Sequence, residues 1–547
     1  MGVRRDEEVF SLIAACLVAA VAKIVIILFT WSVMPRSWYV LDTIYLMILI
    51  GATRVSYRLI RLRRQNRTFP WSKRKKVMII GGGEAGRSLI TEIQNSKYLD
   101  QKVVCIIDDD PYKIGRYIKG VKVVGNRNSI KKSVKKYNVQ QIILTIPSAN
   151  AAKIRPIVEI CQDTNCELMI LPGVYQLVNG EVRASKLRPV NIDDLLGRDE
   201  VYVNLNEIMD YVSGRVIMVT GGGGSIGSEL CRQIAKHNPK QLIIFDIYEN
   251  NAYDIQQELL REQPKLDLVV LIGSVRDENR INSIFEQYRP EIIYHAAAHK
   301  HVPLMEGSPN EAIKNNVLGT YNMVRMADKW NAKRFVQIST DKAVNPTNIM
   351  GASKRICEMI IQTYNKESNT EYVAVRFGNV LGSNGSVIPL FKKQIAEGGP
   401  VTVTHPEIIR YFMTIPEAVS LVLQAGAYAK GGEIFVLDMG EPVKILDLAR
   451  NMIRLSGYKV DQDIKIEFTG LRPGEKLYEE LLMDEEGMTD TPNKLIHIGH
   501  PIDVDEVKLA HALRVLESAA QNETDDMRLI VESIVPTYHP QLNKSTQ

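Results

Sequence analysis

One stretch of this chain, RVIMVTGGGGSIGSELCRQI from Arg215 to Ile234, limits the possible folds more than any other. An apolar strand runs into a glycine-rich turn, and a helical pattern follows at once. Glycines at Gly221, Gly224 and Gly227 allow backbone N–H groups and a helix start to approach a pyrophosphate closely. This order of elements predicts a doubly wound α/β domain that binds a dinucleotide.

The strands that follow support a dinucleotide site. QLIIFDIYE places Asp246 where a carboxylate can bind ribose hydroxyls and repel a 2′-phosphate, which favours NAD over NADP. Asp277 follows the next strand, near the expected adenine, and Ala296 and Ala297 follow EIIYH, where larger side chains would clash with a dinucleotide. An empty crevice is the alternative. The predicted cofactor-binding residues are Thr220, Gly221, Gly224, Ser225, Ile226, Gly227, Asp246, Asp277, Ala296, Ala297 and Lys354.

A second glycine-rich turn lies nearer the N-terminus, in KVMIIGGGEAGRSLI, with Gly81, Gly83 and Gly86. The following strand ends at Asp108, again well placed to meet a ribose. No catalytic pattern follows it. We therefore expect a Rossmann-like nucleotide-binding domain with a vestigial or regulatory role, and the sequence leaves its ligand open.

With 547 residues, of which 45% are hydrophobic and 24% charged, the chain is globular and too long for one core. We expect a membrane anchor with a basic flank over residues 1–66, the first Rossmann-like domain over 67–187, and a catalytic domain with a smaller C-terminal substrate lobe over 188–547. The six cysteines form no CxxC pair or His cluster, which indicates a reducing compartment and no metal site.

The N-terminal region suggests membrane insertion. The run 11–31 is long enough for a helical span, although it contains Lys23, and the run 38–52 is shorter and contains Asp42. A basic stretch free of acids follows, which predicts that the rest of the chain is cytoplasmic. We expect about two transmembrane helices in contact with lipid and a multi-pass location in the cell membrane. A buried or interfacial second helix is the alternative. The net charge of +5 gives no support for a nucleic-acid partner.

Seven blocks between residues 194 and 482 carry a family resemblance. They are DLLGR (194–198), TGGGGSIGSEL (220–230), HAAAHKHVPLME (295–306), STDKAVNPTNIMGASKR (339–355), RFGNVLGSNGSVIPLF (376–391), RYFMTIPEA (410–418) and LRPGEKLYEELL (471–482). In these blocks the chain resembles the extended short-chain dehydrogenase/reductases, and among them the membrane-anchored nucleotide-sugar 4,6-dehydratases of the CapD-like family. It departs from that family in having room for about two spans rather than four, and in Ser274, where Asp is usual.

The resemblance implies a UDP-N-acetylglucosamine 4,6-dehydratase that uses NAD. Such an enzyme oxidises C4, eliminates water across C5 and C6, and returns the hydride to C6. By resemblance, Thr340 would hydrogen-bond the C4 oxygen, Asp341 would protonate the departing C6 hydroxyl and Lys342 would take the C5 proton. Lys342 must then be partly neutral, which burial and a nearby cationic Lys354 can promote. A simple Asp/Lys surface pair is the alternative.

Met350 stands where a short-chain dehydrogenase normally has a tyrosine, and a thioether cannot trade protons. Met350 and Lys354 are four residues apart, so they share a helix face. We expect Lys354 to hold the nicotinamide ribose and Met350 to fill the tyrosine's volume. Removal of the C4 hydroxyl proton would then run through Thr340, Asp341 or a water. A methionine that only packs in the core is the fallback interpretation.

The predicted substrate-binding residues are Lys300, Asn379, Arg410, Arg472 and Glu475. Guanidinium groups suit phosphate oxygens and a carboxylate suits ribose hydroxyls, so together they favour a UDP-N-acetylhexosamine, although any one could be a surface ion pair. A homo-oligomer is expected. A UDP-sugar 4-epimerase and a non-catalytic membrane sensor are alternative functions, and the C5 configuration of the product and the receiving glycan are left open.

Overall fold

The computed structural model describes residues 74–96, 99–149, 151–164, 166–171, 187–191, 194, 209–480, 487–499 and 504–540, with scattered positions between 25 and 56. These residues fall into two compact units, one from 1–147 and 166–188, the other from 148–165 and 189–547. Each unit is described by itself.

The first unit contains a seven-stranded sheet in the order β3-β4-β2-β1-β5-β6-β7. Its central strand β1 pairs in parallel with β2 and β5 and is buried from Val77 to Ile80, as expected for a strand covered on both faces. The elements are β1 (Lys75–Ile80), α3 (Glu84–Asn95), β2 (Gln101–Ile107), β3 (Tyr117–Ile118), β4 (Val121–Gly125), α4 (Ile130–Tyr137), β5 (Gln141–Leu144), β6 (Glu167–Ile170) and β7 (Arg188–Pro189).

The second unit is built on a nine-stranded sheet in the order β10-β9-β8-β11-β12-β13-β18-β22-β21. β8 lies between β9 and β11, so the strand order reverses beside it, and ligands bind at such a switch point. In this spatial order, the strands from β10 through β18 are parallel, whereas β22 and β21 are antiparallel additions. The strands are β8 (Val216–Thr220), β9 (Gln241–Asp246), β10 (Leu268–Ile272), β11 (Ile292–His295), β12 (Arg334–Ile338), β13 (Glu371–Arg376), β18 (Ile434–Leu437), β21 (Met488–Asp490) and β22 (Ile496–Gly499).

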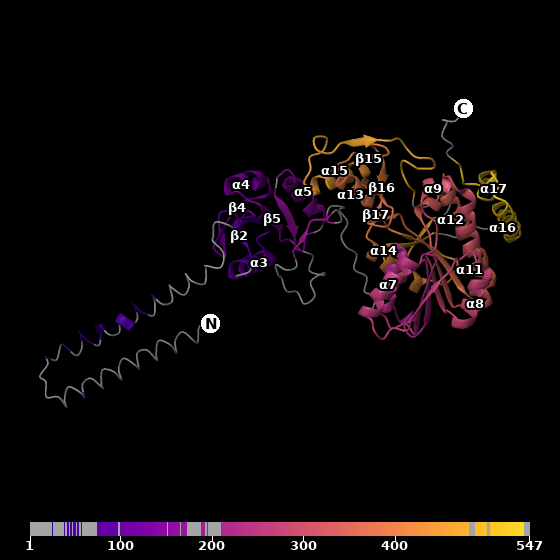
Figure 1. Ribbon diagram of the computed structural model, residues 1–547, viewed down its shortest axis with the longest axis horizontal. Helices are drawn as coiled ribbons and strands as arrows, with labels where there is room; N and C mark the ends of the chain where they lie inside the picture. The colour runs from indigo at the N-terminus through magenta and orange to yellow at the C-terminus, as the bar shows by residue number, and fades with distance from the viewer. Residues whose placement is uncertain are drawn as a thin grey trace. The chain divides into compact units, whose positions relative to one another are not determined.

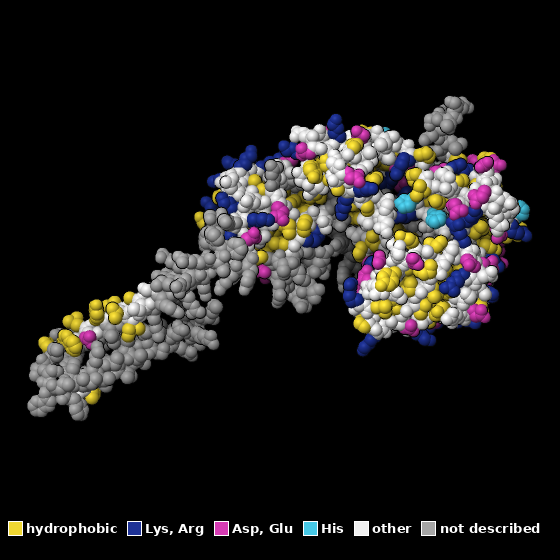
Figure 2. Space-filling view, viewed as in Figure 1, with side chains coloured by type: hydrophobic (Ala, Val, Ile, Leu, Met, Phe, Trp, Pro, Cys, Tyr) yellow, Lys and Arg dark blue, Asp and Glu magenta, His cyan; other side chains and the backbone are white. Residues whose placement is uncertain are grey.

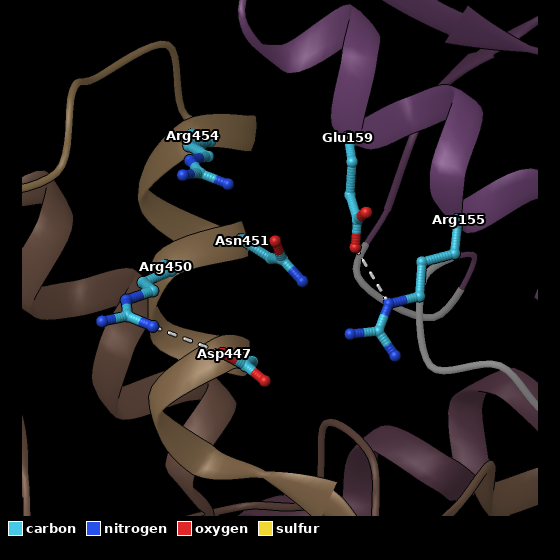
Figure 3. A pocket seen from close by; sticks show the side chains of 6 residues that line it. All are labelled: Arg155, Glu159, Asp447, Arg450, Asn451 and Arg454. Carbon is cyan, nitrogen blue, oxygen red and sulfur yellow. Dashed lines mark hydrogen bonds and ion pairs between the residues drawn. The ribbon is translucent and has the colours of Figure 1, made fainter. Parts of the chain in front are cut away.

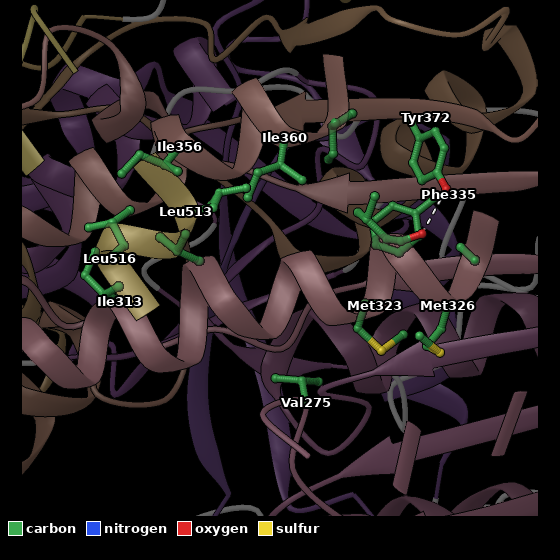
Figure 4. Packing of buried hydrophobic residues seen from close by; sticks show 14 of the residues in the cluster. Val275, Ile313, Met323, Met326, Phe335, Ile356, Ile360, Tyr372, Leu513 and Leu516 are labelled. Atoms are coloured by element: carbon green, nitrogen blue, oxygen red, sulfur yellow. Dashed lines mark hydrogen bonds between the residues drawn. The ribbon is translucent and has the colours of Figure 1, made fainter. Parts of the chain in front are cut away.

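Helices cover both faces of this sheet (Figure 1). On one face α6 (Ser225–Ala235) packs beside α7 (Glu249–Glu262) and α14 (Ile415–Tyr428). On the other, α11 (Gly319–Lys329) lies between α8 (Glu278–Tyr288) and α12 (Ile349–Glu367). Figure 4 shows the core on this second face, where Phe335 and Tyr372 from the strands are buried with residues of α11 and α12.

The C-terminal helices α16 (Glu506–Gln521) and α17 (Met527–Ile534) extend the same core. Leu513 and Leu516 of α16 are buried with Ile313 and Ile356 (Figure 4). These helices therefore support α12, which carries Met350 and Lys354. Shorter helices α9 (Val302–Glu306) and α10 (Pro309–Ala312) connect β11 to η8 (Ile313–Leu318).

After β13 the long alternation of strand and helix gives way to short paired strands: β14 (Asn379–Val380) with β17 (Phe412–Met413), β15 (Val401–Val403) with β20 (Ile466–Phe468), and β16 (Ile409–Arg410) with β19 (Val443–Lys444). Helices α13 (Val387–Ala396) and α15 (Ile445–Leu455) pack with them. We call this region, which was predicted to bind the substrate, the substrate lobe. Over the second unit, basic and acidic side chains are interspersed (Figure 2).

The predicted α/β, Rossmann-like architecture is confirmed, but the predicted membrane helices are not. No helix formed by the described residues combines the length and apolar character that crossing a membrane requires. The run 38–52 carries Asp42, and it is shorter than the about 20 apolar residues that a helical span needs. This finding corrects both the predicted two-helix anchor and the multi-pass membrane location. Apart from Val25, the run 11–31 lies outside the described residues, as does most of the DLLGR block.

Candidate active site

The glycine-rich turn after β8 has the close packing that a cofactor cradle needs. Gly221 has a φ of +66°, and a Cβ there would lie 2.8 Å from the backbone nitrogen of Ala297. A Cβ on Gly227 would lie 2.1 Å from the Gly221 carbonyl oxygen. Gly224 is the N-cap of α6, which starts at Ser225. The turn, the start of α6 and the small residues after β11 therefore meet at one edge of the sheet.

Asp246, at the end of β9, is fixed to that turn. Its Oδ2 accepts a 2.8 Å hydrogen bond from the Gly223 N–H, and its Oδ1 accepts one of 2.8 Å from the Tyr248 N–H. The carboxylate is thus held beside the turn. Asp277 is different, because it is exposed and caps α8 by accepting a 2.9 Å bond from the Arg280 N–H.

A buried polar chain that the sequence analysis missed supports the floor of this site. Thr220 and His295 are register partners in β8 and β11, and Thr220 Oγ1 lies 2.6 Å from His295 Nδ1. His295 Nε2 lies 3.1 Å from Thr320 Oγ1. Burial, helped by the Lys354 charge, lowers the pKa of His295 to about 3. The imidazole is therefore neutral. The sequence EIIYH does not indicate that the last side chain of this strand is buried in a chain of polar groups.

The loop after β14 reaches the same turn. The Asn384 N–H donates a 3.1 Å hydrogen bond to Ser225 Oγ. Ile226, the next residue of α6, packs against the core on the α6 face. Within the second unit, Ser225 is thus held by a hydrogen bond and Ile226 by packing.

The predicted catalytic residues converge just after β12. Thr340 caps the short turn η9 (Asp341–Ala343), and its Oγ1 donates a 2.8 Å hydrogen bond to Asp341 Oδ1. Lys342 Nζ donates a 2.9 Å bond to the same oxygen. Asp341 is only 1% exposed. A hydroxyl, a carboxyl and an amine therefore share one point at the carboxyl edge of the sheet.

Lys342 is charged in this arrangement, contrary to the expectation that it is partly neutral. Burial works against the ammonium, but the Asp341 carboxylate at 2.9 Å and the Glu479 carboxylate at 3.5 Å raise the pKa of Lys342 above its ordinary value. Arg410 opposes them only in part. Two carboxylates close to one amine explain the difference, and the sequence placed only Asp341 beside it.

A buried ion cluster lies beneath this point. Ser339 Oγ and Arg376 Nε each donate a 2.7 Å hydrogen bond to Glu358 Oε1, and Arg355 Nη1 lies 2.9 Å from Glu358 Oε2. Although burial alone would raise it, the two guanidinium groups lower the pKa of Glu358 to about 2. The cluster ties α12 to the ends of β12 and β13, directly before Thr340.

Met350 and Lys354 lie in the first turns of α12, which Asn348 caps by accepting a 2.8 Å bond from the Gly351 N–H. Met350 is 4% exposed and belongs to the apolar core on this face. Its burial agrees with the core-packing interpretation as well as with a space-filling role. Lys354 is also buried, which lowers its pKa.

The structure brings most of the predicted substrate residues into one ionic chain. Asn379 Oδ1 accepts a 3.4 Å bond from Lys342 Nζ. Arg410 is 7% exposed and pairs with Glu475 at 3.5 Å, and Glu475 also pairs with the exposed Arg472 at 3.1 Å. Lys300, in the loop before α9, is exposed.

Glu479 joins this chain and was missed from the sequence. It lies 3.5 Å from Lys342 Nζ and 3.7 Å from Arg410 Nε. Within LRPGEKLYEELL, only burial separates Glu479 from its exposed neighbour Glu480. Sequence spacing alone carries no signal that selects one of two adjacent glutamates.

A pocket of about 230 Å³ in the second unit contains none of the predicted site residues. Figure 3 shows its lining, which consists of Arg155 and Glu159 from α5 (Ala151–Gln162) and Asp447, Arg450, Asn451 and Arg454 from α15. Arg155 pairs with Glu159 at 3.0 Å, and Arg450 pairs with Asp447 at 3.5 Å. Its charges are therefore largely paired within each helix.

The chain is similar to known families and proteins along most of its length. A family model described as polysaccharide biosynthesis protein matches residues 217–501, just over half of the chain, and a CoA-binding domain model matches residues 1–172. The capsular polysaccharide biosynthesis protein CapD of Staphylococcus aureus is 47% identical over 485 residues, which cover 88% of this chain and 80% of that protein.

The probable polysaccharide biosynthesis protein EpsC of Bacillus subtilis is 47% identical over 457 residues, covering 83% of this chain and 76% of that protein. Among solved structures, Pen from Bacillus thuringiensis is 35% identical and aligns with a TM-score of 0.49, covering 53% of this chain and 90% of that one.

Proposed function

This chain belongs to the polysaccharide biosynthesis protein family that includes CapD and EpsC, and we propose that within it the protein is an NAD-dependent UDP-N-acetylglucosamine 4,6-dehydratase. The observation that carries this proposal is that Thr340 and Lys342 both donate hydrogen bonds to one carboxylate oxygen of Asp341. A methionine occupies position 350, so acid/base work needs groups other than a tyrosine.

The residues at the carboxyl edge of the sheet fit a dinucleotide. Gly221 and Gly227 lie too close to neighbouring backbone for a side chain, so the approach to the start of α6 is free of side chains at these positions. Asp246 offers carboxylate oxygens for ribose hydroxyls. The chemistry that bound NAD supplies is a hydride acceptor for C4 and, later, a hydride donor for C6. Lys354 is the residue proposed to hold the nicotinamide ribose.

The chain's own groups supply the proton transfers. Elimination across C5 and C6 needs a base at C5 and an acid at the C6 oxygen. Moving one proton over the 2.9 Å from Lys342 Nζ to Asp341 Oδ1 makes the amine neutral and the carboxyl protonated, which is the pair of states required. Thr340, whose hydroxyl already donates to Asp341, is placed to exchange that partner for the C4 oxygen. The proton that the C4 hydroxyl loses on oxidation leaves through a water, Lys342 returns its proton to C5 as the hydride returns to C6, and a proton from water restores Asp341.

On the substrate side, we propose that Arg410 and Arg472 bind the diphosphate and that Glu475 binds ribose hydroxyls, with Asn379 and Lys300 beside them. These arginines pair internally with Glu475, so binding the diphosphate exchanges one set of oxygen partners for another. A homo-oligomer stays a prediction, which light scattering of the full chain tests.

The direct test is to incubate the full chain with UDP-N-acetylglucosamine and follow the nucleotide sugar by mass spectrometry, with proton NMR to distinguish the 4-epimer, which has the same mass as the substrate. We expect a product lighter by one water and no net reduction of NAD, because the hydride taken from C4 returns to C6. Formation of UDP-N-acetylgalactosamine alone would show a 4-epimerase, and binding without any conversion would show a sensor. Either result contradicts the proposal.

Gly227→Ala is expected to weaken NAD binding by roughly 5- to 150-fold, since overpacking a tight site costs about 1–3 kcal/mol. The added methyl group would meet the Gly221 carbonyl oxygen at 2.1 Å. Calorimetric titration with NAD measures the effect. Gly83→Ala, in the other glycine-rich turn, is the matched control because its Cβ would meet nothing within 4 Å. Equal affinities of the two variants for NAD would show that the turn containing Gly221 and Gly227 does not bind NAD.

A further inference from the structure

Glu479 is a buried carboxylate that the proposed proton transfers do not use. Its side chain is 4% exposed, and one oxygen, Oε1, lies 3.5 Å from Lys342 Nζ and 3.7 Å from Arg410 Nε. Burying a carboxylate is costly unless cations pair with it. These two contacts therefore account for its place, and they connect the substrate lobe to the catalytic turn.

The segment that carries Glu479 is docked on the loop that follows Lys342. Thr347 Oγ1 and Asn348 Nδ2 each donate a 3.1 Å hydrogen bond to the Gly474 carbonyl. Gly474 has a φ of +73°, and a Cβ there would lie 2.6 Å from Asn348 Cβ. The position of Glu479 against the amine is thus set by backbone contacts, not only by the ion pair itself.

Charged groups face Lys342 from three directions. Asp341 comes from its own turn, Glu479 from the docked segment and Arg410 from β16, while Asn379 offers a neutral oxygen at 3.4 Å. Two carboxylates against one guanidinium leave a negative excess around the amine. That excess favours the ammonium form, whereas a base for the C5 proton must be neutral.

We propose that Glu479 is a positioning residue that holds the Lys342 amine against Asp341 from the substrate lobe and sets the pH at which Lys342 works as a base. The inference rests on the proposed function, because it takes Lys342 as that base. Arg410 shares the same carboxylate oxygen, so Glu479 also links the amine to the guanidinium proposed to bind the diphosphate.

The pKa of Lys342 can be measured without turnover. The full chain is acylated with a trace of acetic anhydride across a pH series, and labelling of Lys342, whose side chain is 17% exposed, is quantified by mass spectrometry against N-acetyl-lysine amide. We expect the parent chain to show a midpoint above the ordinary lysine value of about 10.4. A midpoint at or below that value overturns the inference and needs no variant.

Glu479→Gln keeps the side-chain shape and removes its charge. We expect the midpoint for Lys342 to fall by about one pH unit or more, because an opposite charge within about 4–6 Å shifts a pKa by roughly 1–3 units. The acidic limb of kcat with UDP-N-acetylglucosamine should move to lower pH by the same amount. Glu479→Asp should bring both values back toward the parent.

Glu480→Gln is the matched control, because that exposed carboxylate pairs with Lys476 and Asn345 instead. Its labelling midpoint should equal that of the parent. The thermal unfolding temperature of Glu479→Gln is compared with that of the parent to show that the variant is folded. If it is folded and its Lys342 labelling midpoint has not moved, the positioning role is rejected, whatever the activity. A shifted midpoint supports that role, and if the parent then dehydrates no sugar, it is the proposed function that fails.

Discussion

Asp341→Asn is expected to lower kcat with UDP-N-acetylglucosamine by about 10²–10⁴-fold, the usual contribution of a general acid. The asparagine oxygen can still accept the hydrogen bonds that Thr340 and Lys342 donate to Asp341, so the turn should keep its shape. It cannot deliver a proton to the departing C6 hydroxyl. KM should change little, because the proposed diphosphate contacts lie in the substrate lobe. Steady-state kinetics with the dehydrated sugar as readout measures both.

Asp505→Asn is the matched control for that substitution. Asp505 caps α16 by accepting a 3.1 Å bond from the Lys508 N–H, and asparagine caps helices about equally well. This variant should keep the parent kcat. If Asp341→Asn also stays within tenfold of the parent, the C6 hydroxyl receives its proton from another group.

Glu358→Gln is expected to destabilise the second unit by about 3–5 kcal/mol, because it removes the buried carboxylate that Arg355 and Arg376 share. Arg376 is 1% exposed and Arg355 4%, so neither guanidinium can recover its lost partner from water without local opening. Denaturant unfolding of the full chain, followed by tyrosine and tryptophan fluorescence, measures the change. Glu278→Gln removes an exposed partner of Arg325 and should leave the transition in place.

The same carboxylate predicts a pH dependence with a definite sign. The pKa of Glu358 is about 2 in the folded protein, below the value of about 4.3 for an unperturbed glutamate. Its contribution to stability is therefore complete above the unfolded value and is lost as the pH falls toward 2. The parent chain should lose more stability over this acid range than Glu358→Gln does. Parallel acid-unfolding curves would remove Glu358 as the cause.

The sequence predicted the parts of the site that depend on local order. A strand, a glycine-rich turn and a helix fix where Gly221 and Gly227 lie, and the parallel sheet brings Asp246 and Thr340 to the same edge. Side chains that follow parallel strands share that edge whatever the loops do. The α/β fold and the meeting of Thr340, Asp341 and Lys342 could therefore be anticipated.

The charge on Lys342 could not be anticipated, because it depends on Glu479, which lies 137 positions further along the chain. Local spacing does not indicate which of two adjacent glutamates turns inward. The support that α16 and α17 give α12 was also missed, because it depends on contacts between segments far apart in the sequence. The predicted membrane anchor rested on hydropathy, on the basic stretch that follows and on the family resemblance, and the described residues contain no helix that meets the requirements of a span.

The proposed elimination runs through Asp341 and Lys342, with no tyrosine at position 350. Proton NMR of the full chain with UDP-N-acetylglucosamine in deuterated water tests it most directly. We expect a new C6 methyl signal from a 4-keto-6-deoxy sugar, with solvent deuterium at C5 and no loss of NAD. A sugar that keeps its C6 hydroxymethyl signals and its C5 proton would contradict it.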